Sequence, residues 1–157
     1  MKFSTRQDIE APAHFVFAQL TDFQSIEKQA LRRGIEVKRK DDSQMNGVGA
    51  AWEAKVPFRG KWRDLHAEIS QFEAPEELVA QARSGGLDMT ISMELVPLSP
   101  KRTRLIVGFD VRPKTISARI LVQSVKFAKT SLQRRFDKRV LKLSGTIAER
   151  FETGVSA

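Results

Sequence analysis

The chain has 157 residues and no cysteine, with 41% hydrophobic and 29% charged residues. This size and composition indicate one globular domain that is stabilised by packing, and they exclude intrinsic disorder, disulfide bonds, thiolate catalysis and cysteine-based metal centres. The net charge of +8 arises mainly in the C-terminal part, because residues 96–157 hold 14 Lys and Arg against 4 Asp and Glu.

The first eight residues lack the apolar segment of a secretory signal, and no run of about 18 apolar residues occurs in the chain. We therefore expect a soluble, cytoplasmic protein without a membrane span.

The N-terminal region predicts one strand followed by two short helices. Residues 2–10 alternate between apolar and polar side chains, as in an edge strand. Pro12 suits the first turn of a helix, and the apolar residues from Phe15 to Phe23 recur with helical spacing. A second helix over residues 25–33 should end at Gly34.

Residues 34–113 predict successive strands separated by turn residues. Turns are expected at residues 58–60 (FRG) and 84–86 (SGG), and short connections of this kind indicate an antiparallel meander. The clearest alternation lies in residues 87–95 and 103–111, where each strand has one apolar and one mostly polar face.

The C-terminal region predicts one long amphipathic helix. No glycine or proline occurs between Pro113 and Gly145, and apolar residues recur at steps of three and four. These residues are Leu121, Val125, Ala128, Leu132, Phe136, Val140, Leu143 and Ile147.

A second apolar stripe lies nearly opposite the first on this helix. It consists of Ile116, Ile120 and Phe127. We expect these side chains to be buried within the domain; the alternatives are a homodimer contact or a lid at a cavity mouth.

The order of elements resembles the helix-grip fold of the START-like, or SRPBCC, superfamily, and in particular its bacterial polyketide cyclase/dehydrase-like members. Residues 9–17 (IEAPAHFVF) with 20–23 (LTDF) are similar to the opening of that family, and residues 95–105 (LVPLSPKRTRL) to its penultimate hairpin. The resemblance implies an α+β fold in which six to seven antiparallel strands curve around the long C-terminal helix. We expect a single domain over residues 1–152 and a short tail over 153–157.

The resemblance also implies a cavity between the concave face of the sheet and the long helix. The apolar face of each strand would line it, unless these side chains simply fill the core. The expected ligand-binding residues are Trp52, Phe58, Leu65, Ile69, Met89, Ile91, Met93, Leu105, Val107 and Phe109, with Leu121, Val125 and Ala128 from the helix.

Few residues suggest catalysis. Asp64, His66 and Glu68 alternate along one strand, so a carboxylate could orient the imidazole as a general base, but Leu65, Ala67 and Ile69 form the better core face. We therefore expect His66 on the solvated outer face, and His14 on the surface of the first helix. No spacing motif indicates a metal site, a phosphate-binding loop or a cofactor.

The sequence therefore favours a carrier or accessory protein that binds an apolar small molecule such as a lipid, a quinone or a polyketide-like compound. A cyclase or isomerase using His66 with Asp64 or Glu68 is the first alternative, and an interaction module working through the basic helix is the second. Because the basic residues cover a broad arc of that helix, we expect no specific nucleic-acid binding and at most weak attraction to anionic surfaces.

Overall fold

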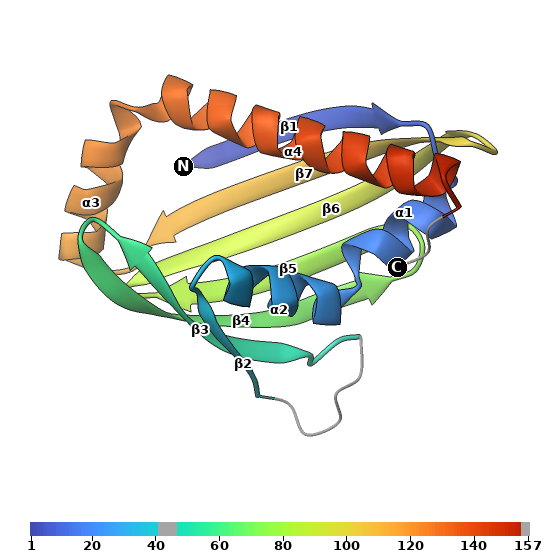
Figure 1. Ribbon diagram of the computed structural model, residues 1–157. Coiled ribbons are helices and arrows are strands. Elements are labelled where there is room, and N and C mark those ends of the chain that lie inside the picture. The colour runs from blue at the N-terminus through green and yellow to red at the C-terminus, as the bar shows by residue number, and fades with distance from the viewer. Residues whose placement is uncertain (41–46, 155–157) are drawn as a thin grey trace.

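A computed structural model describes residues 1–40 and 47–154 of the chain. Seven strands form one antiparallel sheet, in the order β1-β7-β6-β5-β4-β3-β2. The sheet curves around the C-terminal helix, and two short helices follow the first strand (Figure 1), which confirms the predicted α+β helix-grip fold. The strands are β1 (Lys2–Ile9), β2 (Glu36–Arg39), β3 (Ala51–Phe58), β4 (Lys61–Glu73), β5 (Glu77–Ser84), β6 (Leu87–Ser99) and β7 (Arg102–Pro113).

Two predicted turns lie at one end of the sheet. Arg59 and Gly60 connect β3 to β4, and Gly85 and Gly86 connect β5 to β6; all four residues have positive φ angles. Two such residues in succession match the right-handed twist of a hairpin. A β-carbon on Gly86 would also lie 2.6 Å from Oγ1 of Thr115, the N-cap residue of α3 (Ile116–Lys126), so glycine is required where this turn meets the start of that helix.

The two short helices are α1 (Ala13–Leu20) and α2 (Phe23–Arg32), so α2 begins two residues before the predicted range of 25–33 and ends one residue before the end of that range. Asp22 caps α2, because its carboxylate accepts a hydrogen bond from the backbone N–H of Ser25 at 3.3 Å. Gly34 follows the helix with a φ of 78°, which a residue with a β-carbon adopts only at a cost. A tight turn therefore leads the chain from α2 into β2.

The prediction of one uninterrupted C-terminal helix was wrong. The structure has α3 (Ile116–Lys126) and α4 (Lys129–Glu152), separated by Phe127 and Ala128. Helix α3 buries Ala118 and Val122, whereas α4 buries Val140, Ser144 and Ile147 much farther along the chain. Figure 1 shows the two helices running in different directions, with α4 along the sheet and α3 across its end. Of the predicted tail, residues 155–157 lie outside the described residues.

The expected burial of the second apolar stripe was also wrong. Ile116, Ile120 and Phe127 are 79%, 66% and 96% exposed. The break turns α3 across the end of the sheet, and its contact with the rest of the domain passes through Ala118 and Val122 instead. This stripe is therefore a solvent-facing apolar surface of the single chain.

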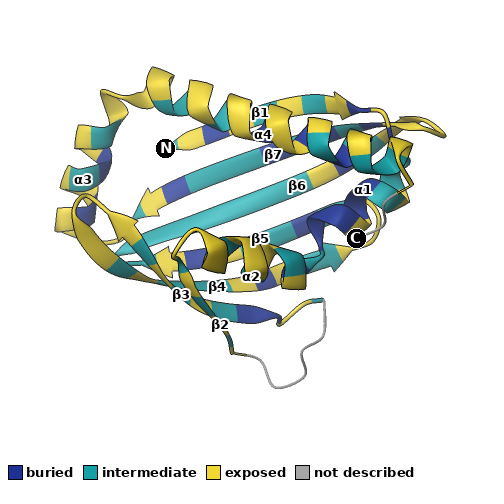
Figure 2. Cartoon of the chain, viewed as in Figure 1, coloured by how far each residue is buried: buried dark blue, intermediate teal, exposed yellow. Residues whose placement is uncertain are grey.

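The hydrophobic core is concentrated at one end of the molecule. Ile9, Val16, Leu105 and Ile147 are at most 1% exposed, and they join β1, α1, β7 and the second half of α4. Figure 2 shows buried segments near α1, whereas the middle parts of β5, β6 and β7 are mainly of intermediate burial. The concave face is therefore tightly packed at the α1 end and only partly covered elsewhere.

Candidate functional site

An apolar cavity of about 280 Å³ lies between α2 and the concave face of the sheet. Twelve of the described residues line it, of which eleven are apolar and the twelfth is a glutamate. Such a lining favours the transfer of an apolar molecule out of water. The lining residues are Leu20, Phe23, Ile26, Glu27, Ala30, Val37, Trp52, Ile69, Leu78, Ala80, Ile91 and Met93.

Small side chains on β5 explain why the floor of this cavity is not filled. Ala80 lies between Ile69 of β4 and Ile91 of β6 in the strand register. A larger β-branched residue at this place would occupy the space above the sheet, whereas a methyl group leaves it open. The larger side chains of the neighbouring strands then form the walls.

The rim of the cavity carries one polar cluster. Trp52 Nε1 donates a hydrogen bond to Glu27 Oε1 at 2.6 Å, and Arg39 Nη1 lies 3.9 Å from the same oxygen. The Arg39 guanidinium is 4.8 Å from the centre of the Trp52 ring, a distance at which a cation is attracted to the π face. Phe23 packs edge-on against the same ring at 5.0 Å. Helix α2 and strands β2 and β3 are thus joined at this rim.

Four of the expected ligand-binding residues line the cavity, namely Trp52, Ile69, Ile91 and Met93. The others lie elsewhere. Leu105 and Val107 are buried in the core at 0% and 4% exposure, Met89 and Phe109 are half-buried, and Phe58 is exposed near the β3–β4 turn. Leu65 is half-buried near the β5–β6 turn.

The three residues expected from the C-terminal helix do not line the cavity. Leu121 and Val125 are half-buried on α3, and Ala128 is exposed at the break. The helix that covers the cavity is α2, because α4 packs along β1 at the opposite edge of the sheet. Ligand binding by the lining residues remains a prediction.

The α2 side of the cavity was not predicted, although the sequence contains a pattern that indicates it. Phe23, Ile26 and Ala30 follow one another at steps of three and four residues, so they share one face of α2. The sequence prediction placed Phe23 in the first helix and Ile26 and Ala30 in the second, and it assigned none of them to the cavity. Val37 and Ala80 lie on the same sheet face as Trp52 and Ile91, respectively, through the register.

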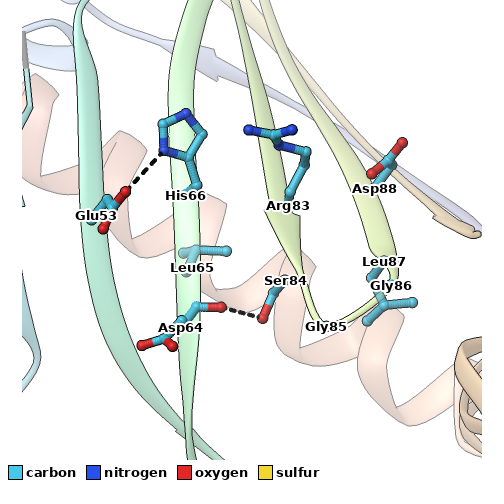
Figure 3. Close-up of a pocket in the computed structure, with 10 residues that line it drawn as sticks. All are labelled: Glu53, Asp64, Leu65, His66, Arg83, Ser84, Gly85, Gly86, Leu87 and Asp88. Carbon is cyan, nitrogen blue, oxygen red and sulfur yellow. Dashed lines mark hydrogen bonds and ion pairs between the residues drawn. The ribbon is translucent and has the colours of Figure 1, made fainter.

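A second, shallower hollow of about 560 Å³ lies at the convex side of the sheet, near the β5–β6 turn (Figure 3). Its lining is mainly polar and charged, and Ser84 Oγ donates a hydrogen bond to the backbone carbonyl of Asp64 at 2.6 Å. The larger volume does not make it the better ligand site, because its charged groups are already solvated. The residues drawn in Figure 3 are Glu53, Asp64, Leu65, His66, Arg83, Ser84, Gly85, Gly86, Leu87 and Asp88.

His66 points to this convex face, as predicted. Its neighbour is a carboxylate on the adjacent strand, however, and neither Asp64 nor Glu68, because His66 Nδ1 lies 3.7 Å from Glu53 Oε1. The register places charged residues of both signs side by side across the face. The directly opposed residues run in the order Lys38, Glu53, His66, Arg83, Asp88 and Arg112.

His66 is therefore one member of a cross-strand row of charged side chains, on the other side of the sheet from the apolar cavity. His14, the second histidine, is exposed on α1. Within residues 1–40 and 47–154, no group of three or more His, Asp or Glu side chains is arranged to hold a metal ion. None of the helices described is both long and apolar enough to cross a bilayer.

Comparison with solved structures supports the fold. The Zhui aromatase/cyclase from a Streptomyces species is 12% identical and covers 100% of this chain and 99% of its own, with a TM-score of 0.68. Norcoclaurine synthase from Thalictrum flavum is 12% identical over 96% of this chain and 92% of its own, with a TM-score of 0.65. A Thermus thermophilus protein is 14% identical over 99% and 100%, with a TM-score of 0.64.

Identities of this size show a likeness of fold alone. A sequence search of curated proteins gave no match. A profile of the family described as polyketide cyclase/dehydrase and lipid transport matches residues 1–147, nearly the whole chain. The chain belongs to this polyketide cyclase/dehydrase and lipid-transport family.

Proposed function

We propose that this protein binds an apolar small molecule in the cavity under α2, as a carrier or accessory protein. A lipid, a quinone or a polyketide-like compound fits this chemistry. The observation that carries the proposal is the lining, in which eleven apolar side chains surround about 280 Å³ next to a packed core. The family description and the names of two structural neighbours, an aromatase/cyclase and a synthase, also favour a bound organic ligand.

The proposal can be tested by filling the cavity with a larger side chain on the sheet. Ala80→Phe places an aromatic ring in the space between α2 and the sheet, so we expect the variant to lose binding of the neutral two-ring dye Prodan, measured by fluorescence titration. Ala30→Phe fills the same space from α2. It is a second, independent test in case Ala80→Phe disturbs the local fold. Circular dichroism checks that both variants fold.

Ala128→Phe is the matched control, because Ala128 is exposed and lies outside the cavity lining. It adds the same ring to the same parent residue, and we expect it to bind the dye as the wild type does. If the wild type binds no dye, or if all three variants bind it equally, the proposal is wrong. If the wild type binds the dye and the cavity variants do not, native mass spectrometry of freshly purified protein can identify the ligand class through a copurifying molecule.

An enzyme that uses His66 is the alternative function. The position of His66 on the convex face, 3.7 Å from Glu53, argues against it because the imidazole does not line the apolar cavity. We expect His66→Ala to leave dye binding unchanged. Turnover of a cyclisable substrate that is lost in His66→Ala would reverse this preference.

The proposal includes a cytoplasmic location, which cell fractionation tests, and at most weak attraction to anionic surfaces. Of the ten Lys and Arg from residue 114 to residue 150, nine are spread over two helices with different directions. Exposed charges are screened over about 8 Å at physiological ionic strength. We expect no retention by anionic liposomes or nucleic acid at about 0.15 M salt; clear retention would favour an interaction module.

A further inference from the structure

Among the described residues that line the cavity, Glu27 is the single charged one, and binding of an apolar molecule does not by itself require a charged residue there. It lies on the same face of α2 as Phe23 and Ala30, so its side chain is at the rim of the cavity, where it is partly exposed. The Glu27 side chain is 27% exposed and that of Arg39 is 17% exposed. A carboxylate in such a place is costly unless other groups hydrogen-bond to it.

The contacts of Glu27 fix its direction and leave one oxygen for a further donor. Both the Trp52 indole N–H, at 2.6 Å, and the Arg39 guanidinium, at 3.9 Å, engage Oε1. Within the described residues Oε2 has no such partner. An ionised carboxylate has about four acceptor positions, so Oε2 can accept a hydrogen bond from a molecule in the cavity.

The charges of Glu27 and Arg39 determine which kind of hydrogen-bond donor the ligand can carry. Arg39 Nη1 lies 3.9 Å from Glu27 Oε1 and offsets part of the negative charge of Glu27, so the pair does not require a cationic ligand. An anionic ligand head would meet the carboxylate across an apolar cavity, where like charges repel strongly. A neutral hydroxyl can donate to Oε2 without altering this balance.

We propose that Glu27 determines ligand specificity, and that the cavity takes a small, mainly apolar molecule with a neutral hydroxyl group that donates to the Glu27 carboxylate. This inference rests on the proposed function and adds the ligand class to it. The volume of about 280 Å³ is at the lower end of ligand pockets, so the molecule has one or two fused rings rather than two long acyl chains.

Three probes with the same ring system test the inference, namely naphthol, naphthalene and naphthoate. Their dissociation constants are measured by titration calorimetry and by the fluorescence of Trp52 in a Trp62→Phe background. A hydrogen bond to a charged group corresponds to an affinity gain of roughly 10-fold to 100-fold. We expect naphthol to bind more tightly than naphthalene by that factor, and naphthoate to bind most weakly.

Two variants of Glu27 separate the acceptor from the charge. Glu27→Met removes the acceptor, so naphthol should lose its advantage while naphthalene binds as before. Glu27→Gln keeps the size and one acceptor oxygen but removes the charge, so naphthoate should gain affinity. Glu53→Gln is the matched control, because Glu53 is a carboxylate on the convex face and its side chain is 55% exposed.

The outcomes distinguish this inference from the proposed function. Equal binding of naphthol and naphthalene by the wild type overturns the role of Glu27 and leaves the apolar carrier intact. An unchanged naphthol advantage in Glu27→Met overturns it as well, with naphthalene binding as the proof that the variant is folded. Failure of all three probes and of Prodan to bind overturns both proposals together.

Discussion

At the scale of single residues, the pairing of β1 with β7 is reinforced by charge. Asp8 lies directly opposite Arg104 in the register, and Arg104 Nε donates a hydrogen bond to Asp8 Oδ1 at 2.8 Å. Arg102 Nη2 lies 3.4 Å from the other carboxylate oxygen. The hydrogen bond from Arg104, followed by the attraction of both guanidinium groups, lowers the pKa of Asp8 below its ordinary value of 3.8.

This lowered pKa predicts an acid-sensitive contribution to stability. A carboxyl group whose pKa is lower in the folded state contributes stability above 3.8, and this contribution is lost as the pH falls through the folded pKa. We expect Asp8→Asn to lower the urea midpoint at neutral pH, with a deficit that shrinks as the pH falls below 3.8 and through the lowered pKa of Asp8.

Glu68→Gln is the control for Asp8→Asn, because within the described residues Glu68 has no ion pair and its side chain is exposed. A deficit for Asp8→Asn that is the same at every pH would contradict the assignment to ionisation.

Thr103 predicts a larger effect from a neutral group. It is 0% exposed, and its hydroxyl donates to the carbonyl of Ala11 at 2.8 Å, so it fastens β7 to the segment between β1 and α1. Thr103→Val keeps the shape but leaves a buried carbonyl without its donor. We expect a loss of about 1 to 3 kcal/mol in the free energy of unfolding, measured by chemical denaturation.

Thr130→Val on the exposed surface of α4 should change the free energy of unfolding by less than about 0.5 kcal/mol. Equal losses for the two threonine variants would show that the hydrogen bond to Ala11 is not the cause.

At the scale of secondary structure elements, substitutions on the two faces of α3 should have different effects on the free energy of unfolding. Ile120 is 66% exposed and Val122 is 6% exposed, although only one residue separates them. Ile and Ser have similar helix propensities, so Ile120→Ser should change the free energy of unfolding by less than about 0.5 kcal/mol. Val122→Ala should cost about 2 kcal/mol, which thermal and chemical denaturation can resolve.

A loss above about 1 kcal/mol for Ile120→Ser would mean that the stripe of Ile116, Ile120 and Phe127 is covered, as in a homodimer. Sedimentation equilibrium of the wild type and of Ile120→Ser would then show the change in oligomeric state directly.

Strands β6 and β7, together with helices α3 and α4, show what the periodicity of apolar residues can and cannot predict. Alternation in residues 87–95 and 103–111 predicted β6 and β7 because each strand has one apolar face, which is a local property. The break at Phe127 and Ala128 was not predictable in this way, since no glycine or proline marks it and the apolar steps continue through it. Tertiary packing of α3 at the sheet end determines it.

For the candidate site, the sequence predicted the sheet side of the cavity in part and missed the helix side. Trp52, Ile69, Ile91 and Met93 were identified because strand alternation assigns side chains to a face. Phe23, Ile26 and Glu27 were missed because a helical stripe gives the direction of a face but not the surface that it covers. The ion pair of Glu27 with Arg39 joins distant segments, which local patterns do not reveal.

At the scale of the whole molecule, packing is unequal between the two ends of the concave face. Ile9, Leu105 and Ile147 form a dense core beside α1, whereas the cavity is closed mainly by α2. The convex face is instead solvated through its cross-strand row of charged residues, from Lys38 to Arg112. The protein therefore has a densely packed core at one end and a cavity closed mainly by one short helix at the other. Of the elements around the cavity, α2 is the one that tertiary packing stabilises least.

Helix α2 has ten residues and buries only Phe23, and helices of this length are marginal without tertiary packing. It should therefore melt locally at a free energy well below that of global unfolding, and its amides should exchange hydrogen much faster than those of β6 and β7. Hydrogen exchange with mass spectrometry checks this expectation. Equal protection of α2 and β6 would contradict it.

A ligand held under α2 stabilises the closed helix, so saturation with naphthol should slow exchange in α2 more than in α4. Loading and release would then proceed through transient melting of this one helix, without unfolding of the sheet. The residence time of the ligand would then depend on the stability of α2. Substitutions that raise the helicity of α2 should lengthen the residence time, and substitutions that lower it should shorten the residence time. The melting temperature of the whole protein should hardly change in either case.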